Sequence, residues 1–180
     1  MKKHEAFLMR NKHKHNDKDD FRTPPYLFAY IEKRYGKIDF DGACTPDVNN
    51  LAAPLRLEDE WPVGATIYSN PPFDSESITK WVKKGRKHAL NGGTHIMLLP
   101  DKLTQCFFAE LFPMIQEIIF LGGRVNFVSP YAVKGGASMS GSIIIAQKQR
   151  VRLPRDLTII AVDNVLIRDL KKQYNEGVNS

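Results

Sequence analysis

The stretch Thr66-Ile67-Tyr68-Ser69-Asn70-Pro71-Pro72-Phe73 decides how the middle of this 180-residue chain folds. Its first four residues combine a β-branched pair with a tyrosine, which is typical of a short buried strand. The two prolines have no backbone N–H and a fixed φ angle, so the strand must end abruptly at Asn70. We therefore predict a buried strand that places Asn70 on a sharp turn.

Helical and strand patterns alternate on both sides of this stretch. Residues 75–88 place Ile78, Trp81 and Val82 on one helical face and basic side chains on the other. Residues 37–44 form an expected strand whose end carries Asp41 and a small-residue turn. The other expected elements are a helix that begins at Thr23-Pro24-Pro25 and ends at Gly36, a loop over 45–64, a helix over 104–116, and strands over 95–100, 117–121, 125–128, 142–146 and 157–162.

This alternation of helices with apolar strands predicts an α/β domain built on a mostly parallel central sheet. Ligands of such sheets bind beyond the carboxyl ends of the strands. Asp41 and Asn70 both follow strands, so we expect them to share one crevice. Residues 21–180 are expected to form this single domain, and residues 1–20, which lack apolar periodicity, a flexible basic arm.

Composition limits the possible partners. A net charge of +6 and a pI near 9.3 favour a polyanion, although solvated lysines explain many basic proteins equally well. The two cysteines, Cys44 and Cys106, are isolated, which argues against a disulfide framework or a metal site. We find no apolar run long enough for a membrane helix and no signal peptide, so a cytoplasmic protein is expected.

The turn Asn70-Pro71-Pro72-Phe73 has the residues needed to act on a planar amine, and it matches the Asn/Asp/Ser-Pro-Pro-aromatic motif of amino-group methyltransferases. The lone pair of such an amine is delocalised into its ring. Two carbonyl acceptors, on the Asn70 side chain and the Pro71 backbone, can draw it out of conjugation, and Phe73 can stack on the base. The competing interpretation is a strand-ending turn with a core phenylalanine.

Over residues 20–146 the chain resembles the phage N-6-adenine-methyltransferase family, the Dam-like enzymes of phages. An ordered set of segments carries the resemblance: Phe21-Arg22-Thr23-Pro24, Ile38-Asp39-Phe40-Asp41-Gly42-Ala43-Cys44 with Asn49, Asn70-Pro71-Pro72-Phe73, Ile78-Thr79-Lys80-Trp81-Val82, Leu98-Leu99-Pro100 and Gly123-Arg124-Val125-Asn126-Phe127. The resemblance implies a single Rossmann-like, S-adenosylmethionine-dependent methyltransferase domain that modifies the N6 amine of a flipped adenine.

The resemblance also implies which residues surround the cofactor, S-adenosylmethionine. The expected cofactor-binding residues are Thr23, Pro24, Asp41, Gly42, Ala43, Asp47, Asn49 and Asn70. The Asp41 carboxylate suits the methionine ammonium, and Gly42 and Ala43 permit close approach. Asp47 or Asn49 would bond the ribose, unless they only form turns. No Gly-x-Gly-x-x-Gly loop follows the first strand, and Asp41 lies close to Asn70 in sequence, so the domain is expected to be compact and shortened.

The implied substrate is DNA, expected as a double strand, and no metal is expected. Candidate DNA-contacting residues are Phe73, Lys80, Arg124 and Asn126, and the loop over 134–141 is expected near the site. For Arg124, a surface arginine on a strand turn is an equally open interpretation. Alternative activities are methylation of cytosine N4, of a guanine amine in RNA or of a release-factor glutamine, and the chain could also be a catalytically silent DNA-binding module.

Overall fold

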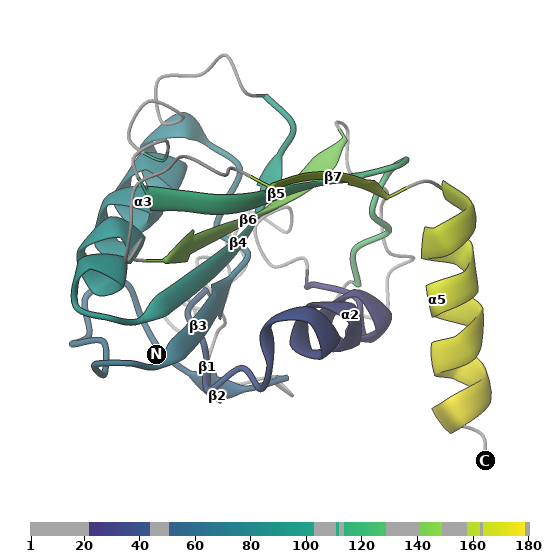
Figure 1. Cartoon of the computed structure of the whole chain (residues 1–180), viewed down its shortest axis with the longest axis horizontal. Helices are drawn as coiled ribbons and strands as arrows, with labels where there is room; N and C mark the ends of the chain where they lie inside the picture. Colours follow the sequence, from purple (N-terminus) through teal and green to yellow (C-terminus); the bar gives the residue numbers. More distant parts are fainter. Residues whose placement is uncertain are drawn as a thin grey trace, which may run out of the picture.

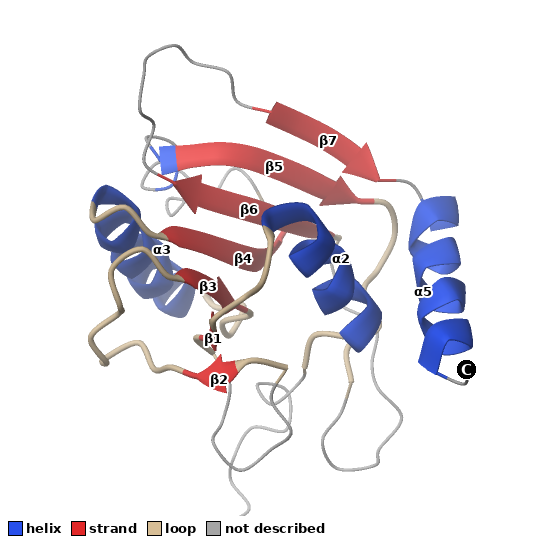
Figure 2. Ribbon diagram, turned by 60° about the horizontal axis from the view of Figure 1, so that its bottom comes forward, coloured by secondary structure: helices blue, strands red, loops and turns tan. Residues whose placement is uncertain are grey.

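The computed structural model describes residues 22–43, 51–102, 111, 114–128, 141–148, 158–162 and 164–178. Within these residues, one seven-stranded sheet has the order β2-β1-β3-β4-β6-β5-β7 (Figure 2). The elements are α2 (Pro25–Tyr35), β1 (Phe40–Asp41), β2 (Ala53–Pro54), β3 (Thr66–Ser69), α3 (Ser75–Leu90), β4 (Thr94–Pro100), β5 (Ile115–Leu121), β6 (Ser142–Lys148), β7 (Thr158–Val162) and α5 (Asn164–Val178).

Only the two strand pairs that contain β6 are antiparallel, and the other four pairs are parallel. The predicted α/β fold with a mostly parallel sheet is confirmed. Within the described residues, no helix is both long and apolar enough to cross a membrane.

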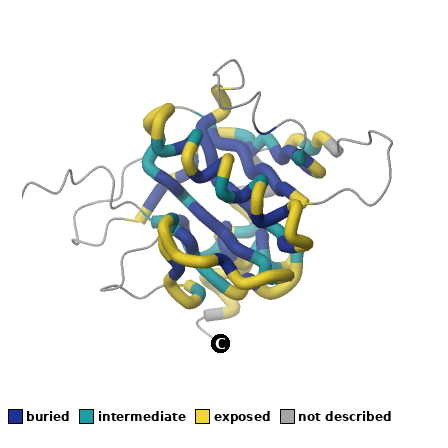
Figure 3. Tube along the Cα trace, turned by 90° about the vertical axis from the view of Figure 1, so that its left-hand side faces the viewer, coloured by how far each residue is buried: buried dark blue, intermediate teal, exposed yellow. Residues whose placement is uncertain are grey.

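Helices cover the two faces of the sheet unequally. Helix α3 packs on one face, and α2 packs on the other with α5 beside it (Figure 1). Strands β3, β4, β5 and β6 are buried along most of their length, and the centre of the molecule is mostly buried (Figure 3). The α2 face has a core that includes Phe28, Ile31 and Tyr68, whereas the α3 face has one that includes Trp61 and Trp81. Each strand therefore sends alternate side chains into two separate cores.

Local signals set the elements nearest the predicted site. Helix α2 begins after Pro24, and the N–H of Gly36, whose φ is 88°, bonds the carbonyl of Glu32 at its end. Helix α3 begins where the Asp74 side chain accepts a hydrogen bond from the Ser77 N–H at 2.8 Å. The predicted helix starting at residue 75 and the predicted strand over residues 66–69 are confirmed.

Several expected elements differ in the structure. Strand β1 covers two residues of the predicted 37–44, and β2 lies inside the predicted loop. The segment 125–128 is not a strand. Val125 and Phe127 are buried in alternation with exposed residues, but the segment forms no continuous ladder, and Val128 pairs with Arg22 in an isolated bridge. The prediction followed alternation, which an extended segment shows without a full ladder.

The C-terminal half of the chain holds the other corrections. The predicted helix over 104–116 is wrong at its end, because β5 begins at Ile115, where side chains enter the sheet core. Most of that predicted helix lies outside the described residues. Helix α5 was not predicted. The strands predicted over 95–100, 117–121, 142–146 and 157–162 correspond to β4, β5, β6 and β7.

The strand order reverses at β1, which lies between β2 and β3. Phe40 pairs with Ile67 and Asp41 with Tyr68, so the two strands end side by side. The N–H of Gly42 also donates to the carbonyl of Tyr68 at 2.7 Å. This is the topological switch point of the sheet, where ligands of open α/β folds bind.

Candidate active site

The turn that follows β3 is held between two regular elements. Strand β3 ends at Ser69, and Asp74 caps α3 immediately after the turn. Pro71 is buried, whereas Asn70, Pro72 and Phe73 are partly exposed. A turn with a buried proline at its centre and a strand and a capped helix at its ends has little freedom to move. The candidate catalytic residues therefore lie on a rigid part of the molecule.

Phe73 is oriented by a second aromatic ring. Its ring meets that of Phe127 edge-on, with centroids 6.0 Å apart and an interplanar angle of 80°. Phe127 directly precedes Val128, which pairs with Arg22. The N–H of each of these two residues donates to the backbone carbonyl of the other at 2.9 Å. Three segments that are distant in sequence, around residues 22, 73 and 127, thus meet at one place.

Thr23 is bound directly to the strand that leads into the turn. Its buried hydroxyl lies 2.5 Å from the hydroxyl of Tyr68. Phe28 of α2 packs edge-on against the Tyr68 ring at 5.3 Å. Burial raises the pKa of Tyr68. The Thr23 hydrogen bond lowers it by less than burial raises it, and the charge of Asp41 adds a smaller rise. Tyr68 therefore stays a neutral hydroxyl. Its role could not be predicted from the sequence, where it has the pattern of an ordinary strand residue.

Asp41 is the last residue of β1 and is largely desolvated. Burial raises the pKa of its carboxyl to about 6, against the smaller lowering effects of the Ala43 N–H and the charge of Arg22. The Ala43 N–H donates to Asp41 Oδ1 at 3.3 Å. A carboxylate in this condition favours a cation or ammonium partner, since a positive charge restores the stabilisation that burial removes. The group fits the amino-acid portion of S-adenosylmethionine.

Gly42 has a packing requirement of its own. A Cβ atom at this position would lie 2.9 Å from Cζ3 of Trp81 and 3.3 Å from the carbonyl oxygen of Tyr68. The glycine therefore allows the β1 turn to approach α3 and β3. Ala43, the next residue of this turn, is partly exposed, and Pro24 before α2 is buried. The expected Asp47 and Asn49, the arm over residues 1–20 and nearly all of the loop over 134–141 lie outside the described residues.

The expected DNA-contacting residues occupy two different places. Arg124 and Asn126 are exposed in the segment after β5 that also contains Phe127. Lys80 is exposed on α3, where its ammonium group lies 2.7 Å from Glu76 Oε1. Asn126 thus directly precedes Phe127, whose ring contacts Phe73, while Lys80 contacts Glu76 of its own helix.

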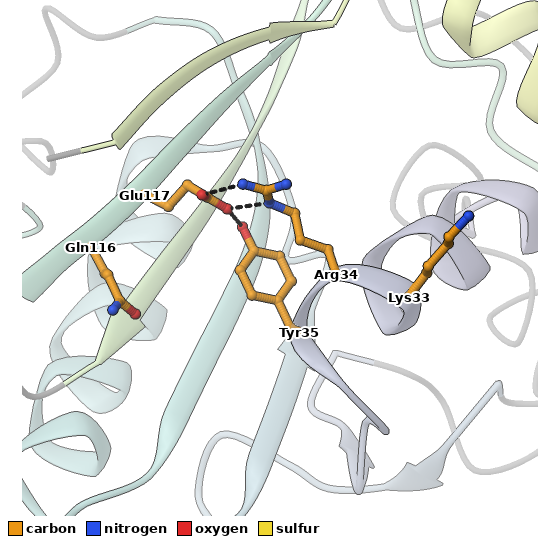
Figure 4. A pocket seen from close by; sticks show the side chains of 5 residues that line it. All are labelled: Lys33, Arg34, Tyr35, Gln116 and Glu117. Atoms are coloured by element: carbon orange, nitrogen blue, oxygen red, sulfur yellow. Dashed lines mark hydrogen bonds and ion pairs between the residues drawn. The ribbon is translucent and has the colours of Figure 1, made fainter.

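A pocket lies at the other end of α2, away from the switch point. It is lined by Lys33, Arg34, Tyr35, Gln116 and Glu117 (Figure 4). The Glu117 carboxylate accepts hydrogen bonds from the guanidinium of Arg34 and from the hydroxyl of Tyr35. These contacts join the end of α2 to the start of β5. No local pattern in the sequence predicts this cluster, because Glu117 lies 83 positions from Arg34 and 82 from Tyr35.

Known proteins are similar to this chain in sequence or in fold. A DNA N-6-adenine-methyltransferase of Escherichia phage T1 is 25% identical over 154 residues, a match that covers 73% of this chain and 63% of the relative. The chain thus spans less than two thirds of that relative's length. A Listeria monocytogenes protein described as a class I S-adenosylmethionine-dependent methyltransferase superposes with a TM-score of 0.51 at 15% identity, over 95% of this chain and 74% of that one.

The structural match supports the fold alone, which is that of class I methyltransferases. The family is given by a separate comparison: residues 10–173 match the model of the family described as DNA N-6-adenine-methyltransferase (Dam). This range includes the β1 turn, the Asn70 turn and the segment of Phe127. The chain belongs to the DNA N-6-adenine-methyltransferase (Dam) family.

Proposed function

We propose that this chain transfers the methyl group of S-adenosylmethionine to the N6 amine of an adenine in DNA. Family membership supports the reaction, and one structural observation supports the site. The register of β1 against β3 places Asp41 beside the strand that leads into Asn70-Pro71-Pro72-Phe73. A carboxyl group suited to the methyl donor and two carbonyl groups suited to an amine therefore meet at the switch point.

The cofactor side of the proposed site is built around Asp41. Bound S-adenosylmethionine would supply an electrophilic methyl group. The Asp41 carboxylate would accept hydrogen bonds from its ammonium group, which compensates the desolvation of Asp41. The other residues proposed to border the cofactor are Thr23, Pro24, Gly42, Ala43, Asp47, Asn49 and Asn70.

The substrate side is proposed to hold the amine without a strong base. The side-chain carbonyl of Asn70 and the backbone carbonyl of Pro71 would each accept one N–H of the adenine amine, which frees its lone pair from the ring. Pro72 keeps the turn rigid, because its φ angle is fixed. The two acceptors act by position, so the step needs no change in protonation of either residue.

Phe73 is proposed to stack on the extruded base. Stacking on an aromatic side chain contributes about 1 to 3 kcal/mol, which is comparable with the cost of flipping a base out of a duplex. The edge-on contact with Phe127 fixes the ring before the base arrives. The residues proposed to contact the DNA are Arg124 and Asn126, in the segment of Phe127, and Lys80 on α3. The proposed substrate is double-stranded DNA. The proposed location is the cytoplasm, which is the host cytoplasm if a phage encodes the chain.

A labelled transfer assay tests this function. The full chain is incubated with methyl-labelled S-adenosylmethionine and defined duplex DNA, and the DNA is then digested to nucleosides. We expect the label in N6-methyladenine, more from duplex than from single-stranded DNA, and at least about 100-fold slower labelling with Asn70→Ala. Single-molecule mapping of the modified bases would then give the recognition sequence.

Other outcomes of the same assay would overturn the proposal. Label in N4-methylcytosine would show that the turn holds a cytosine amine. Transfer only to RNA would show that the substrate is not DNA. No binding of S-adenosylmethionine in calorimetry, together with retained DNA binding, would indicate a silent DNA-binding module. Against that alternative stands the turn itself, since binding alone does not need two carbonyl acceptors beside an aromatic ring.

A further inference from the structure

A chain of buried hydrogen bonds joins the last residue of β3 to helix α3. The Ser69 hydroxyl lies 2.8 Å from Nε2 of His95, and Nδ1 of His95 lies 3.1 Å from Oε1 of Gln147. Gln147 Nε2 in turn donates to the carbonyl of Val82 at 3.5 Å. Ser69, His95 and Gln147 are all fully buried and belong to β3, β4 and β6. The chain therefore crosses three strands on the α3 face of the sheet.

The direction of each hydrogen bond follows from its last member. The amide nitrogen of Gln147 donates to Val82, so its amide oxygen faces His95 and accepts from Nδ1–H. Burial lowers the pKa of His95 to about 3, so the ring is neutral and its Nε2 must be an acceptor. The hydroxyl of Ser69 is then the donor. One tautomer and one hydroxyl orientation satisfy the whole chain.

The surroundings of His95 leave room for this arrangement and little else. A Cβ atom on Gly85 of α3 would lie 1.9 Å from Nδ1 of His95 and 2.3 Å from Oε1 of Gln147. The rings of Trp61 and Trp81 lie 5.0 and 6.5 Å from the imidazole. A buried imidazole pays a desolvation cost that an apolar ring of similar size does not. Its hydrogen bonds, and not its volume, distinguish it from such a ring.

This series of hydrogen bonds begins at Ser69, the residue directly before Asn70. On the α2 face, Tyr68 is bonded to the Thr23 hydroxyl, and on the α3 face, Ser69 is bonded to His95. Successive side chains of a strand point to opposite faces, so these two contacts hold the end of β3 from both sides.

We propose that Ser69, His95 and Gln147 are positioning residues for Asn70 and Pro71. Their hydrogen bonds fix the end of β3 where the two acceptor carbonyls meet the target amine. The inference rests on the proposed function, because it assigns these carbonyls their catalytic role. Small displacements of reacting groups matter here, since a misplacement of about 1 Å can cost roughly 100-fold in rate.

A second buried histidine provides a matched control. His88 lies in the same aromatic cluster, with its ring centroid 5.4 Å from that of Trp61. Its Nε2 bonds the carbonyl of Ala65 at 2.8 Å. Ala65 directly precedes the first residue of β3, at the end of the strand away from Asn70. Both histidines hold β3, but only His95 holds the end that leads into the turn.

The test compares His95→Phe with His88→Phe in the full chain. We expect His95→Phe to lower kcat roughly tenfold while the Kd for S-adenosylmethionine changes by less than about twofold. His88→Phe is expected to lower the melting temperature but to leave kcat of the folded protein unchanged. Equal kcat losses in both variants, or a parallel loss of cofactor affinity with His95→Phe, would assign the network a merely structural role.

Smaller substitutions keep the proposal testable if His95→Phe fails to fold. Ser69→Ala removes only the donor and is expected to lower kcat severalfold, and Ser69→Thr, which keeps the hydroxyl, is expected to retain more activity than Ser69→Val. Normal kcat in both Ser69→Ala and Ser69→Val would overturn the proposal.

A readout without substrate separates this proposal from the proposed function. In the ligand-free protein, nitrogen NMR is expected to show His95 as the neutral Nδ1–H tautomer between about pH 5 and 8. The backbone order parameter of Asn70 is expected to fall in Ser69→Ala but not in His88→Phe. If the wild-type chain transfers no methyl group, the proposed function fails. The positioning role is then tested by the backbone order parameter of Asn70 alone. An unchanged value in Ser69→Ala would refute that role.

Discussion

Two carboxyl groups on the same face of the sheet, those of the half-buried Asp41 and the buried Glu117, are held in opposite ways. Asp41 pairs with Tyr68 in the register of β1 and β3, and Glu117 pairs with Ala146 in that of β5 and β6. Ile96 pairs with both Tyr68 and Ala146, so one row of partners connects the two carboxyls across the sheet. Directly opposed residues share a face, and here it is the face covered by α2.

The two carboxyls differ in how the protein compensates their charge. Burial by itself raises the pKa of Glu117, but hydrogen bonds from Arg34 and Tyr35 and the charge of Arg34 outweigh it, so the net pKa is lowered. At Asp41 burial dominates and raises the pKa to about 6. The contrast separates a cluster that stabilises the fold from a group suited to a ligand, because only the second remains electrostatically costly in the folded chain.

A bulge contributes to this difference. The register of β5 against β6 shifts between Ile115 and Glu117, which leaves Gln116 as the extra residue. Ile115 packs in the core on the α3 face, whereas Glu117 reaches Arg34 and Tyr35 of α2. Regular alternation would put residues 115 and 117 on the same face, so the bulge turns Glu117 toward its partners.

The largest expected effect is a loss of kcat at the candidate active site. Asn70→Ala should lower kcat by about 100- to 1,000-fold, because it removes one of two acceptors that hold the amine. Its melting temperature should stay close to that of the wild type, since Asn70 is partly exposed. Steady-state transfer kinetics and a thermal melt check both points, and an unchanged kcat would exclude the assigned role.

Glu117→Gln tests whether the cluster of Glu117, Arg34 and Tyr35 stabilises the fold. We expect a loss of roughly 2 to 3 kcal/mol at pH 7, allowing for the partial exposure of Arg34, because its charge loses its partner. A lowered carboxyl pKa stabilises the fold above the unfolded value of about 4.3 and less below it. Urea unfolding should therefore show that the difference in free energy of unfolding between wild type and variant shrinks as the pH falls below about 4.3. The kcat per folded molecule should stay constant.

Phe73→Ala asks whether the aromatic pair serves the base or the cofactor. We expect productive DNA binding to weaken by about 1 to 3 kcal/mol through lost stacking, with little change in the Kd for S-adenosylmethionine. The Kd from calorimetry and the KM for duplex DNA separate the two. A loss confined to cofactor affinity would contradict the proposed role of Phe73.

The smallest stability change, and one of opposite sign, is expected at Asp41. A raised carboxyl pKa favours folding below about pH 4 and disfavours it as the pH rises through 6. Asp41→Asn should thus be more stable than the wild type by roughly 1 kcal/mol at pH 7.5 and nearly equal to it at pH 4.

The same substitution should weaken cofactor binding about tenfold, since it removes a charge-assisted hydrogen bond. In the wild type, affinity for S-adenosylmethionine should fall as the pH drops below 6, and this dependence should be absent from Asp41→Asn. Calorimetry at several pH values checks this. Tighter cofactor binding by the variant at pH 7.5 would show that Asp41 does not meet the ammonium.

The elements around the candidate site could be predicted because their signals are local. Proline begins α2, Gly36 follows its last residue, and two prolines stop β3. The rule that parallel strands end at one edge then placed Asp41 and Asn70 together before any contact was known. Strand β2, with two residues, and helix α5 carried no signal that was recognised.

A few adjacent residues are enough to predict each of three features: the α/β class, the turn that holds Asn70, and the set of motifs that marks the family. The tertiary structure alone decided which partner each polar side chain meets: Tyr68 for Thr23, Ser69 for His95, and Arg34 for Glu117. These partners lie 26 to 83 positions apart. No local pattern encodes such pairs, since strand order, register and a single bulge bring them within hydrogen-bonding distance.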